Sequence, residues 1–197
     1  AGRTNAILVC ASLTGNHHRL DFLIGPGRAL DTERFCIIAT DPIGNGLSTS
    51  PSNSARQPGM AFPRFTIRDM VHAQHRLLTE ELGLSKLHAV VGASMGGMQA
   101  LQWAVIHPSF MATCIAMTPR ARTAPWAVLV TETARSCLMA DPAWTGSGFD
   151  GVPERGWRAY AGVMSALLSR TPMALDEARP GLAETHHWFA QTVKQVR

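Results

Sequence analysis

Ser94 lies between two glycines at a spacing of two, in the segment Gly92-Ala93-Ser94-Met95-Gly96. An apolar run precedes it and small, helix-forming residues follow, so the pattern predicts a strand, a tight turn and a helix. Such a turn holds the serine in a strained backbone conformation and lifts its hydroxyl clear of the sheet. Gly92 and Gly96 are expected there because a Cβ would collide with the neighbouring strand or helix. We therefore predict that Ser94 is a catalytic nucleophile.

A second interpretation makes Ser94 only the cap of a helix in a glycine-rich nucleotide-binding turn. That fold requires glycines at the spacing G-x-G-x-x-G, and the spacing of Gly92, Gly96 and Gly97 is different. The chemistry that the pattern favours is acyl transfer. In this reaction the serine hydroxyl attacks a carbonyl carbon, and backbone N–H groups at the start of the helix stabilise the oxyanion.

An oxyanion hole of this kind needs two N–H donors, and the sequence offers a candidate for each. The first is the N–H of Met95, the residue after the nucleophile. The second is the N–H of Leu13, or that of Thr14, in a polar loop that follows an apolar run. The alternative is an ordinary loop between a strand and a helix. His17 and His18 precede the serine, whereas the base follows it in such folds, so we expect them at the rim of a pocket.

The composition is that of a globular protein with a large core. The chain has 197 residues, of which 46% are apolar and 16% are charged. A chain of this length forms one domain, or one domain and part of a second. Its low charge favours a mostly parallel sheet covered on both faces. The formal net charge of +4 includes no basic run, so we expect no nucleic-acid partner. Without a membrane-length apolar stretch or a recognisable signal peptide, we expect a cytoplasmic protein without a membrane partner.

The four cysteines, Cys10, Cys36, Cys114 and Cys137, show no metal-binding spacing. The first three lie inside apolar runs, and no C-x-x-C pair or His/Cys cluster is present. We therefore expect buried free thiols in a reducing compartment and no metal site.

Strands and helices alternate along the first part of the chain. Apolar runs predict strands over residues 6–11, 34–40, 86–92 and 111–117. A short helical turn is expected over residues 26–30, and a long helix from Thr66, which forms a capping box with Asp69, to Leu82 before Gly83. Another helix follows Ser94, and its predicted core-facing residues are Met98, Leu101, Gln102 and Val105. The alternation predicts an α/β fold with a parallel sheet.

The pattern changes after residue 118. No further strand is expected, and helices are predicted over residues 124–140, 154–170 and 181–196. The first of these carries a predicted inward stripe of Trp126, Leu129, Val130, Ala134 and Leu138. A helical block inserted after the strand that follows the nucleophile is typical of a lid over a pocket. We therefore divide the chain into a core, residues 1–122, and a helical lid, residues 123–197.

With these motifs, the chain resembles the homoserine O-acetyltransferase family of α/β-hydrolases over roughly residues 5 to 160. The resemblance is strongest in Ser-Met-Gly-Gly-Met-Gln, residues 94–99, and in Gln-Trp-Ala, residues 102–104. It extends to Leu-Thr-Gly at residues 13–15 and to Asp-Pro-Ala-Trp at residues 141–144. It implies the α/β-hydrolase fold, with a parallel central sheet and a helical lid.

The resemblance also implies a ping-pong reaction. An acyl-CoA acylates the serine, and a small alcohol then accepts the acyl group, as in methionine biosynthesis. Acetyl-CoA or another acyl-CoA is then a substrate, and no cofactor is expected. A homodimer formed through the lid is also implied.

The chain departs from the family pattern in three respects, one of which is that residues 44–53 are only a loose version of the family's glycine-rich stretch. The lid Arg and Tyr that the family uses to bind the acceptor are replaced, at the matching positions, by Ala161 and Leu168. This leaves two further functions open, an esterase-type hydrolase with water as acceptor and a non-catalytic fragment.

The resemblance also places the triad Asp and His on strands after the lid, so the chain is expected to be a fragment without its C-terminal strands. A compact triad within the chain is the alternative, built from Asp141, Asp150 or Asp176 with His186 or His187.

Overall fold

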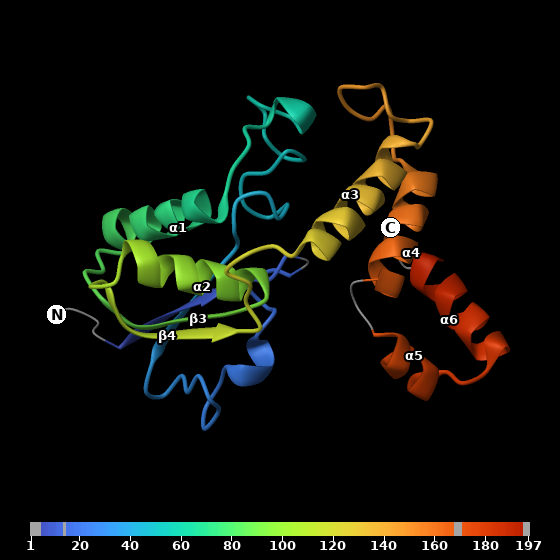
Figure 1. Cartoon of the computed structure of the whole chain (residues 1–197). Coiled ribbons are helices and arrows are strands. Elements are labelled where there is room, and N and C mark those ends of the chain that lie inside the picture. Colours follow the sequence, from blue (N-terminus) through green and yellow to red (C-terminus); the bar gives the residue numbers. More distant parts are fainter. Residues whose placement is uncertain (1–4, 14, 168–170, 195–197) are drawn as a thin grey trace. The chain divides into compact units, whose positions relative to one another are not determined.

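A computed structural model describes residues 5–13, 15–167 and 171–194 of the chain. The contacts divide the chain into two compact units, Ala1–Ala121 and Arg122–Arg197. The first unit contains the sheet, with helices α1 and α2 on one face, and the second is helical (Figure 1). We describe each unit by itself.

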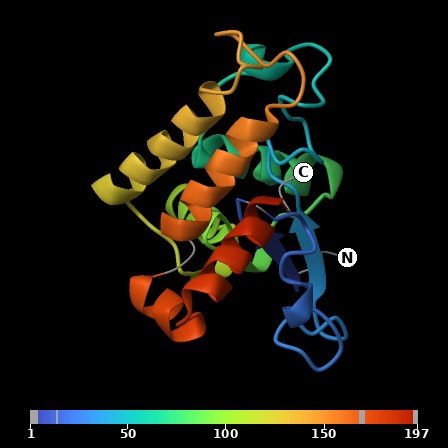
Figure 2. The same cartoon turned by 90° about the vertical axis from the view of Figure 1, so that its right-hand side faces the viewer.

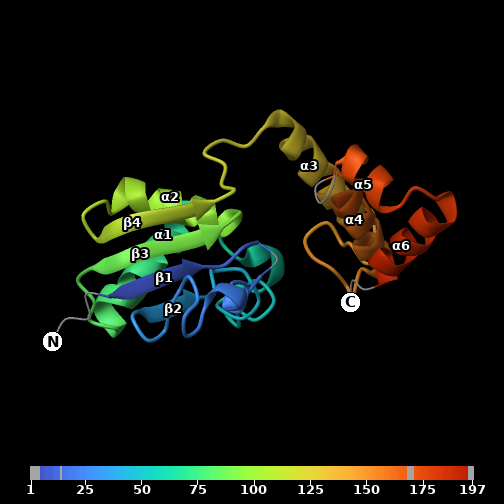
Figure 3. The ribbon, with the colours of Figure 1, turned by 90° about the horizontal axis from the view of Figure 1, so that it is seen from below.

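Four parallel strands form the sheet of the first unit: β1 (Ala6–Cys10), β2 (Cys36–Thr40), β3 (Leu87–Ala93) and β4 (Met111–Met117). Their order across the sheet is β2-β1-β3-β4 (Figure 3). In the pairing register, Cys10 at the end of β1 lies opposite both Thr40 and Gly92. The residues that follow β1, β2 and β3 therefore meet at one edge. The predicted parallel α/β fold is confirmed, and the strand ends differ from the predicted ones by two residues at most.

The long helix begins as predicted but ends differently. Helix α1 (Ile67–Arg76) starts at a complete capping box between Thr66 and Asp69. Its continuation, Leu77–Glu81, is a π-helical turn, and Gly83 follows with a positive φ of 62°. The helical turn expected over residues 26–30 is wrong. A 3-10 turn lies earlier instead, at Asp21–Leu23.

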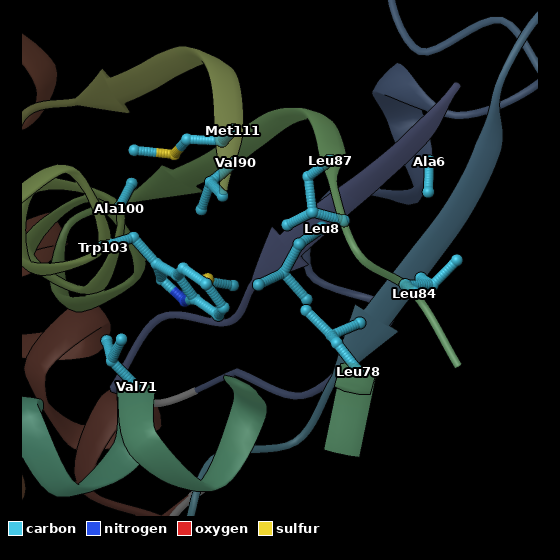
Figure 4. Packing of buried hydrophobic residues seen from close by; sticks show 11 residues of the cluster. Ala6, Leu8, Val71, Leu78, Leu84, Leu87, Val90, Ala100, Trp103 and Met111 are labelled. Carbon is cyan, nitrogen blue, oxygen red and sulfur yellow. The ribbon is translucent and has the colours of Figure 1, made fainter. Parts of the chain in front are cut away.

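Apolar side chains cover both faces of the sheet. The alternation of β1 and β3 directs one set of residues towards α1 and α2, where Leu8, Val71, Val90 and Trp103 are in contact (Figure 4). The opposite face buries the intervening strand residues, with Leu20 and Leu30 over them. Burial on both faces explains why these strands are almost continuously apolar.

The predicted inner face of helix α2 (Met95–Ile106) is wrong. Val105 is 71% exposed, whereas the buried residues include Gln99, Ala100 and Trp103. Two glycines in the first turn explain why the side of the helix that faces the sheet differs from the predicted one. A Cβ on Gly96 would lie 2.2 Å from the carbonyl oxygen of Cys10, in β1. A Cβ on Gly97 would lie 2.8 Å from the carbonyl oxygen of Met117, in β4. The glycine side of the helix therefore faces the sheet, and positions three and four residues further on follow it inward.

The second unit contains four helices within its described residues: α3 (Pro125–Met139), α4 (Glu154–Leu167), α5 (Pro172–Ala178) and α6 (Leu182–Lys194). Helix α4 packs against both α3 and α6 (Figure 2). Helix α5 was not among the predicted helices. None of the helices in the described segments combines the length and apolarity needed to cross a membrane.

The predicted stripe on α3 is only partly buried. Val130 and Ala134 lie inside together with Ala127, but Trp126 and Leu129 are each 59% exposed. The reason is close helix packing, since a Cβ on Gly156 of α4 would lie 3.0 Å from the Cα of Leu138. Small residues fill such a contact, and the large side chains of α3 project away from it.

None of the four cysteines is in a disulfide, but only Cys10 is buried, and the other three are partly exposed. Burial raises the pKa of the Cys10 thiol to about 12, against a smaller opposing effect of its contact with Gln74. Cys10 is therefore a protonated core residue at neutral pH.

Candidate active site

Ser94 is the single residue between the last residue of β3 and the first residue of α2. Its φ is 55° and its ψ is −119°, a backbone conformation that residues other than glycine rarely adopt. The Ser94 side chain is exposed and makes no capping hydrogen bond to the helix, although the residue stands at the N-cap position. This geometry contradicts the interpretation of Ser94 as a helix cap and leaves its hydroxyl available to a substrate.

Two glycines make this turn possible. A Cβ on Gly92 would lie 2.2 Å from the carbonyl carbon and oxygen of Gly96, and a Cβ on Gly96 would lie 2.2 Å from the Cys10 oxygen. Any side chain at either position would force backbone atoms apart. The strand, the turn and the neighbouring strand β1 are thus in backbone contact around Ser94.

The two predicted oxyanion donors are at the same edge of the sheet. Met95 is the first residue of α2, so its N–H has no acceptor within the helix. Leu13 lies in a turn closed by a hydrogen bond of 3.1 Å from the Gly15 N–H to the Ser12 carbonyl. Within the part of the chain that is described, neither the Met95 nor the Leu13 N–H donates to a backbone acceptor. Thr14, the alternative donor, lies outside the described residues.

Side chains join the loop after β1 to the turn that holds Ser94. The Ser12 hydroxyl donates to the carbonyl of Ala93, the last residue of β3, at 2.9 Å. The Gln99 side-chain amide in α2 donates to the carbonyl of Ala11, the first residue after β1, at 3.1 Å. The sequence motifs do not predict these roles of Ser12 and Gln99. For Gln99, the sequence offers one indication, namely that this polar residue lies in the largely apolar stretch that follows Ser94.

His17 is held by Asp41, which follows β2. The His17 N–H and its ring Nδ1 lie 3.0 and 2.7 Å from the two carboxylate oxygens of Asp41, and Asn45 donates to the same carboxylate at 2.8 Å. Partial burial opposes ionisation of Asp41, but the hydrogen bonds from His17 and Asn45 outweigh it and hold its pKa below the usual value. His17 therefore anchors the loop after β1 to the end of β2.

An open cavity of about 550 Å³ borders this loop. The predicted oxyanion residue Leu13 and His18 both line this cavity. Nδ1 of His18 lies 2.8 Å from Oδ2 of Asp21. The complete lining consists of Leu13, Gly15, Asn16, His18, Arg19, Asn45 and Leu47. Its side chains offer amide, imidazole and guanidinium donors, which suit a polar or anionic group.

Asp141, one candidate for a compact triad, has a structural role instead. Its two carboxylate oxygens accept the N–H groups of Ala143 and Gly156, each at 2.8 Å. These backbone hydrogen bonds lower the pKa of Asp141. Because Gly156 is in the first turn of α4, the carboxylate caps that helix from the end of α3.

Within the described residues of the second unit, His186 and His187 make no hydrogen bond to a carboxylate. His187 lies 2.8 Å from the side-chain amide of Gln191, one turn further along α6. Among the described residues, no hydrogen bond joins His186 or His187 to Asp141, Asp150 or Asp176. The hydrogen bonds of these residues thus include no Asp–His pair within the described part of the second unit, and the compact triad stays an untested alternative.

The position expected for an acceptor-binding arginine is apolar and closed. Ala161 is only 6% exposed on α4, and Leu168 lies outside the described residues. The nearby Arg158 is exposed and lies 3.6 Å from Glu154 in an ion pair. In the described segments, no three His, Cys, Asp or Glu side chains are grouped as ligands of a metal ion.

Comparisons with known proteins agree with this architecture. The sequence profile of the alpha/beta hydrolase fold matches residues 5–151. A homoserine O-acetyltransferase from Methanocorpusculum labreanum is 44% identical over 162 residues, which are 74% of this chain and 33% of that protein.

Two solved structures are also similar. The acetyl esterase MekB is 36% identical, with a TM-score of 0.83 over 90% of this chain and 52% of its own. An acetylester hydrolase from Corynebacterium glutamicum is 32% identical, with a TM-score of 0.82 over 90% of this chain and 54% of its own. The chain thus spans from a third to about half of the length of these relatives.

Proposed function

This chain belongs to the α/β-hydrolase fold family, and from that premise we propose that the protein transfers an acyl group through an acyl-enzyme at Ser94. One observation carries the proposal: the strained, exposed Ser94 has a hydroxyl that the helix does not use. A strained serine is retained in a fold when its position serves chemistry. The similarity to a homoserine O-acetyltransferase supports a CoA thioester as the donor and a small alcohol as the acceptor.

The proposed reaction has two halves. In the first half, Oγ of Ser94 bonds to the thioester carbonyl carbon while the hydroxyl proton passes to a general base. The N–H groups of Leu13 and Met95 stabilise the oxyanion, and the C–S bond then breaks to release the CoA thiol with that proton. In the second half, the acceptor hydroxyl passes its proton to the base while its oxygen bonds to the acyl carbon. The bond from Oγ of Ser94 to that carbon then breaks, Oγ takes up the proton from the base, and the acylated alcohol leaves. As the base we propose the triad histidine that the family resemblance implies.

Hydrolysis of acetyl esters is the second candidate function. It uses the same serine and the same oxyanion donors, with water in place of the alcohol. Two observations favour it: the similarity to MekB and to the Corynebacterium glutamicum acetylester hydrolase, and the buried Ala161 where the family has an acceptor-binding arginine.

The experiment that separates these functions uses purified full-length protein with acetyl-CoA. Release of free thiol is followed without acceptor and with candidate alcohols, homoserine included. Acyl transfer predicts that one of the alcohols accelerates thiol release and becomes acetylated. A rate of thiol release that none of the alcohols changes would support the hydrolase instead.

Ser94→Ala tests the part that both functions share. The variant should lose the acetyl group that the wild type carries after mixing with donor, as measured by intact mass, and turnover should fall to the background. Substantial turnover in this variant would remove Ser94 from the mechanism. The homodimer belongs to the same proposal, and light scattering of the full-length protein measures it.

A further inference from the structure

We propose that Gln99 is a positioning residue that sets the spacing between the two oxyanion donors, the N–H groups of Leu13 and Met95. The inference rests on the proposed function and deepens it. It assigns a task to a polar side chain that is completely buried, at 0% exposure. A buried amide needs hydrogen-bond partners, and the partners of Gln99 are the backbone segments that carry the donors.

The Gln99 side-chain amide connects both halves of the predicted oxyanion hole. Its Nε2 donates to the carbonyl of Ala11 at 3.1 Å, and Ala11 is two residues before Leu13. The same Nε2 contacts the carbonyl of Met95, the other donor residue, at the longer distance of 3.4 Å. One nitrogen thus joins the exit of β1 to the first turn of α2. The contact of Gly96 with Cys10 brings the same two segments together at backbone distance.

The orientation of this amide follows from a chain of donors and acceptors that begins at Trp103. The indole N–H can only donate, and it donates to Oε1 of Gln74 at 2.9 Å. Nε2 of Gln74 therefore faces Oε1 of Gln99, at 2.7 Å. This leaves Nε2 of Gln99 to face Ala11. Gln74 is only 4% exposed and also donates to the Thr40 hydroxyl at 3.3 Å, so α1, α2 and β2 all hold the network in place.

A purely structural role for Gln99 makes a different prediction from a positioning role. If the amide only satisfies buried carbonyls, its loss lowers the melting temperature and leaves the chemistry of the folded molecules unchanged. If it sets the donor spacing, its loss weakens binding of the oxyanion, which is absent from the bound substrate, so kcat falls while KM stays.

The test uses full-length protein with the substitution Gln99→Met, which keeps the length of the side chain and removes both polar groups. Gln102→Met is the matched control, because Gln102 is in the same helix and its Nε2 has no hydrogen-bond partner in the described part of the chain. We expect kcat for the acyl donor to fall about 10- to 100-fold in Gln99→Met. KM in this variant, and both constants in Gln102→Met, should stay within about twofold of wild type.

A milder variant covers the case in which Gln99→Met fails to fold. Trp103→Phe removes the N–H that orients Gln74, together with part of a buried ring, and it should lower kcat in the same direction by about threefold to tenfold. Equal kcat in wild type, Gln99→Met and Trp103→Phe would overturn the inference. Ser94→Ala, measured beside them, keeps the two claims apart. An inactive Ser94→Ala with a fully active Gln99→Met contradicts the positioning role alone, whereas an active Ser94→Ala contradicts the proposed function.

Discussion

At the scale of single residues, the candidate site depends on backbone conformations that few residue types can adopt. Ser94 has a positive φ, and Gly92 and Gly96 leave no room for a Cβ. These residues lie within one turn, so the strain at the serine and the close packing of the glycines are parts of one local structure. Both can be measured as stability, independently of activity.

Ser94→Gly should be more stable than Ser94→Ala by about 1 kcal/mol, because glycine adopts a positive φ without the steric cost that alanine keeps. Both variants lack the hydroxyl, so the comparison isolates the backbone strain. Urea unfolding of the full-length variants measures the difference. Equal midpoints, with equal slopes, would show that the turn stores no strain.

Gly96→Ala should destabilise the protein by about 1–3 kcal/mol, because the new Cβ would lie 2.2 Å from the Cys10 carbonyl oxygen and β1 or α2 must move. Gly148→Ala is the control, since nothing lies within 4 Å of a Cβ there and its φ is not in the positive range. The control should change stability by less than about 0.5 kcal/mol. Thermal unfolding of the pair is the measurement, and a similar loss in both variants would contradict the packing argument.

At the scale of elements, hydrogen bonds to carboxylates fix how loops leave the strands and helices. Asp41 holds the loop after β1, and Asp141 holds the start of α4. Asp41 accepts one backbone N–H and Asp141 accepts two, and each carboxyl group has a lowered pKa. Each therefore stabilises the fold only while it is ionised.

The pKa of Asp41 is lower in the folded protein than in the unfolded chain. The Asp41 carboxylate therefore contributes its full stabilisation of the fold above the unfolded pKa of about 3.9, and this contribution is lost as the pH falls through the pKa of the folded state. At pH 7, Asp41→Asn should cost about 1 kcal/mol of stability. The difference from wild type should shrink as the pH falls below about 4. Unfolding curves at pH 7, 5 and 3.5 would measure it, and a difference that does not change with pH would refute the role of the ionised carboxylate.

Asp141→Asn should lower the melting temperature of the full-length protein, because a neutral amide accepts the Ala143 and Gly156 N–H groups less strongly. Asp150→Asn, in the same loop, is the control and should have no effect. The catalytic constants of the folded Asp141→Asn protein should match those of wild type. A specific loss of kcat in Asp141→Asn would instead return Asp141 to the list of candidate catalytic residues.

At the scale of the whole molecule, the two units differ in how many residues their strands and helices bury. Every residue of β1 is buried, and β3 is buried except at His88 and Ala93. Helices α5 and α6 bury no residue completely. Local opening is easier where few side chains are removed from water, so stability should differ between the units.

Amide hydrogen exchange should therefore be slowest in β1 and β3 and faster by at least about tenfold in α5 and α6. Mass spectrometry of peptides from the full-length protein measures both regions in one sample. Uniform protection across the two units would show instead that α5 and α6 are stabilised by contacts with other parts of the protein.

Much of the fold follows from local sequence patterns. Continuous apolar runs predicted the four strands, and the Thr66–Asp69 pair predicted the start of α1, because strand burial and helix capping depend on neighbouring residues. The strand–turn–helix around Ser94 was predicted in the same way, from the glycine spacing. The chemical role of Ser94, and that of Leu13 and Met95, stays a prediction.

Other features depend on contacts between distant segments. The rotation of α2 buries Gln99 and exposes Val105, because Gly96 and Gly97 touch the carbonyls of β1 and β4. Helical periodicity alone cannot reveal which neighbour a helix meets. The hydrogen bond from Gln99 to Ala11 joins residues 88 positions apart. The sequence by itself determined the strand–turn–helix that carries the candidate nucleophile. Only the tertiary structure decided which buried side chains hold the surrounding backbone, because that depends on which segments the sheet brings together.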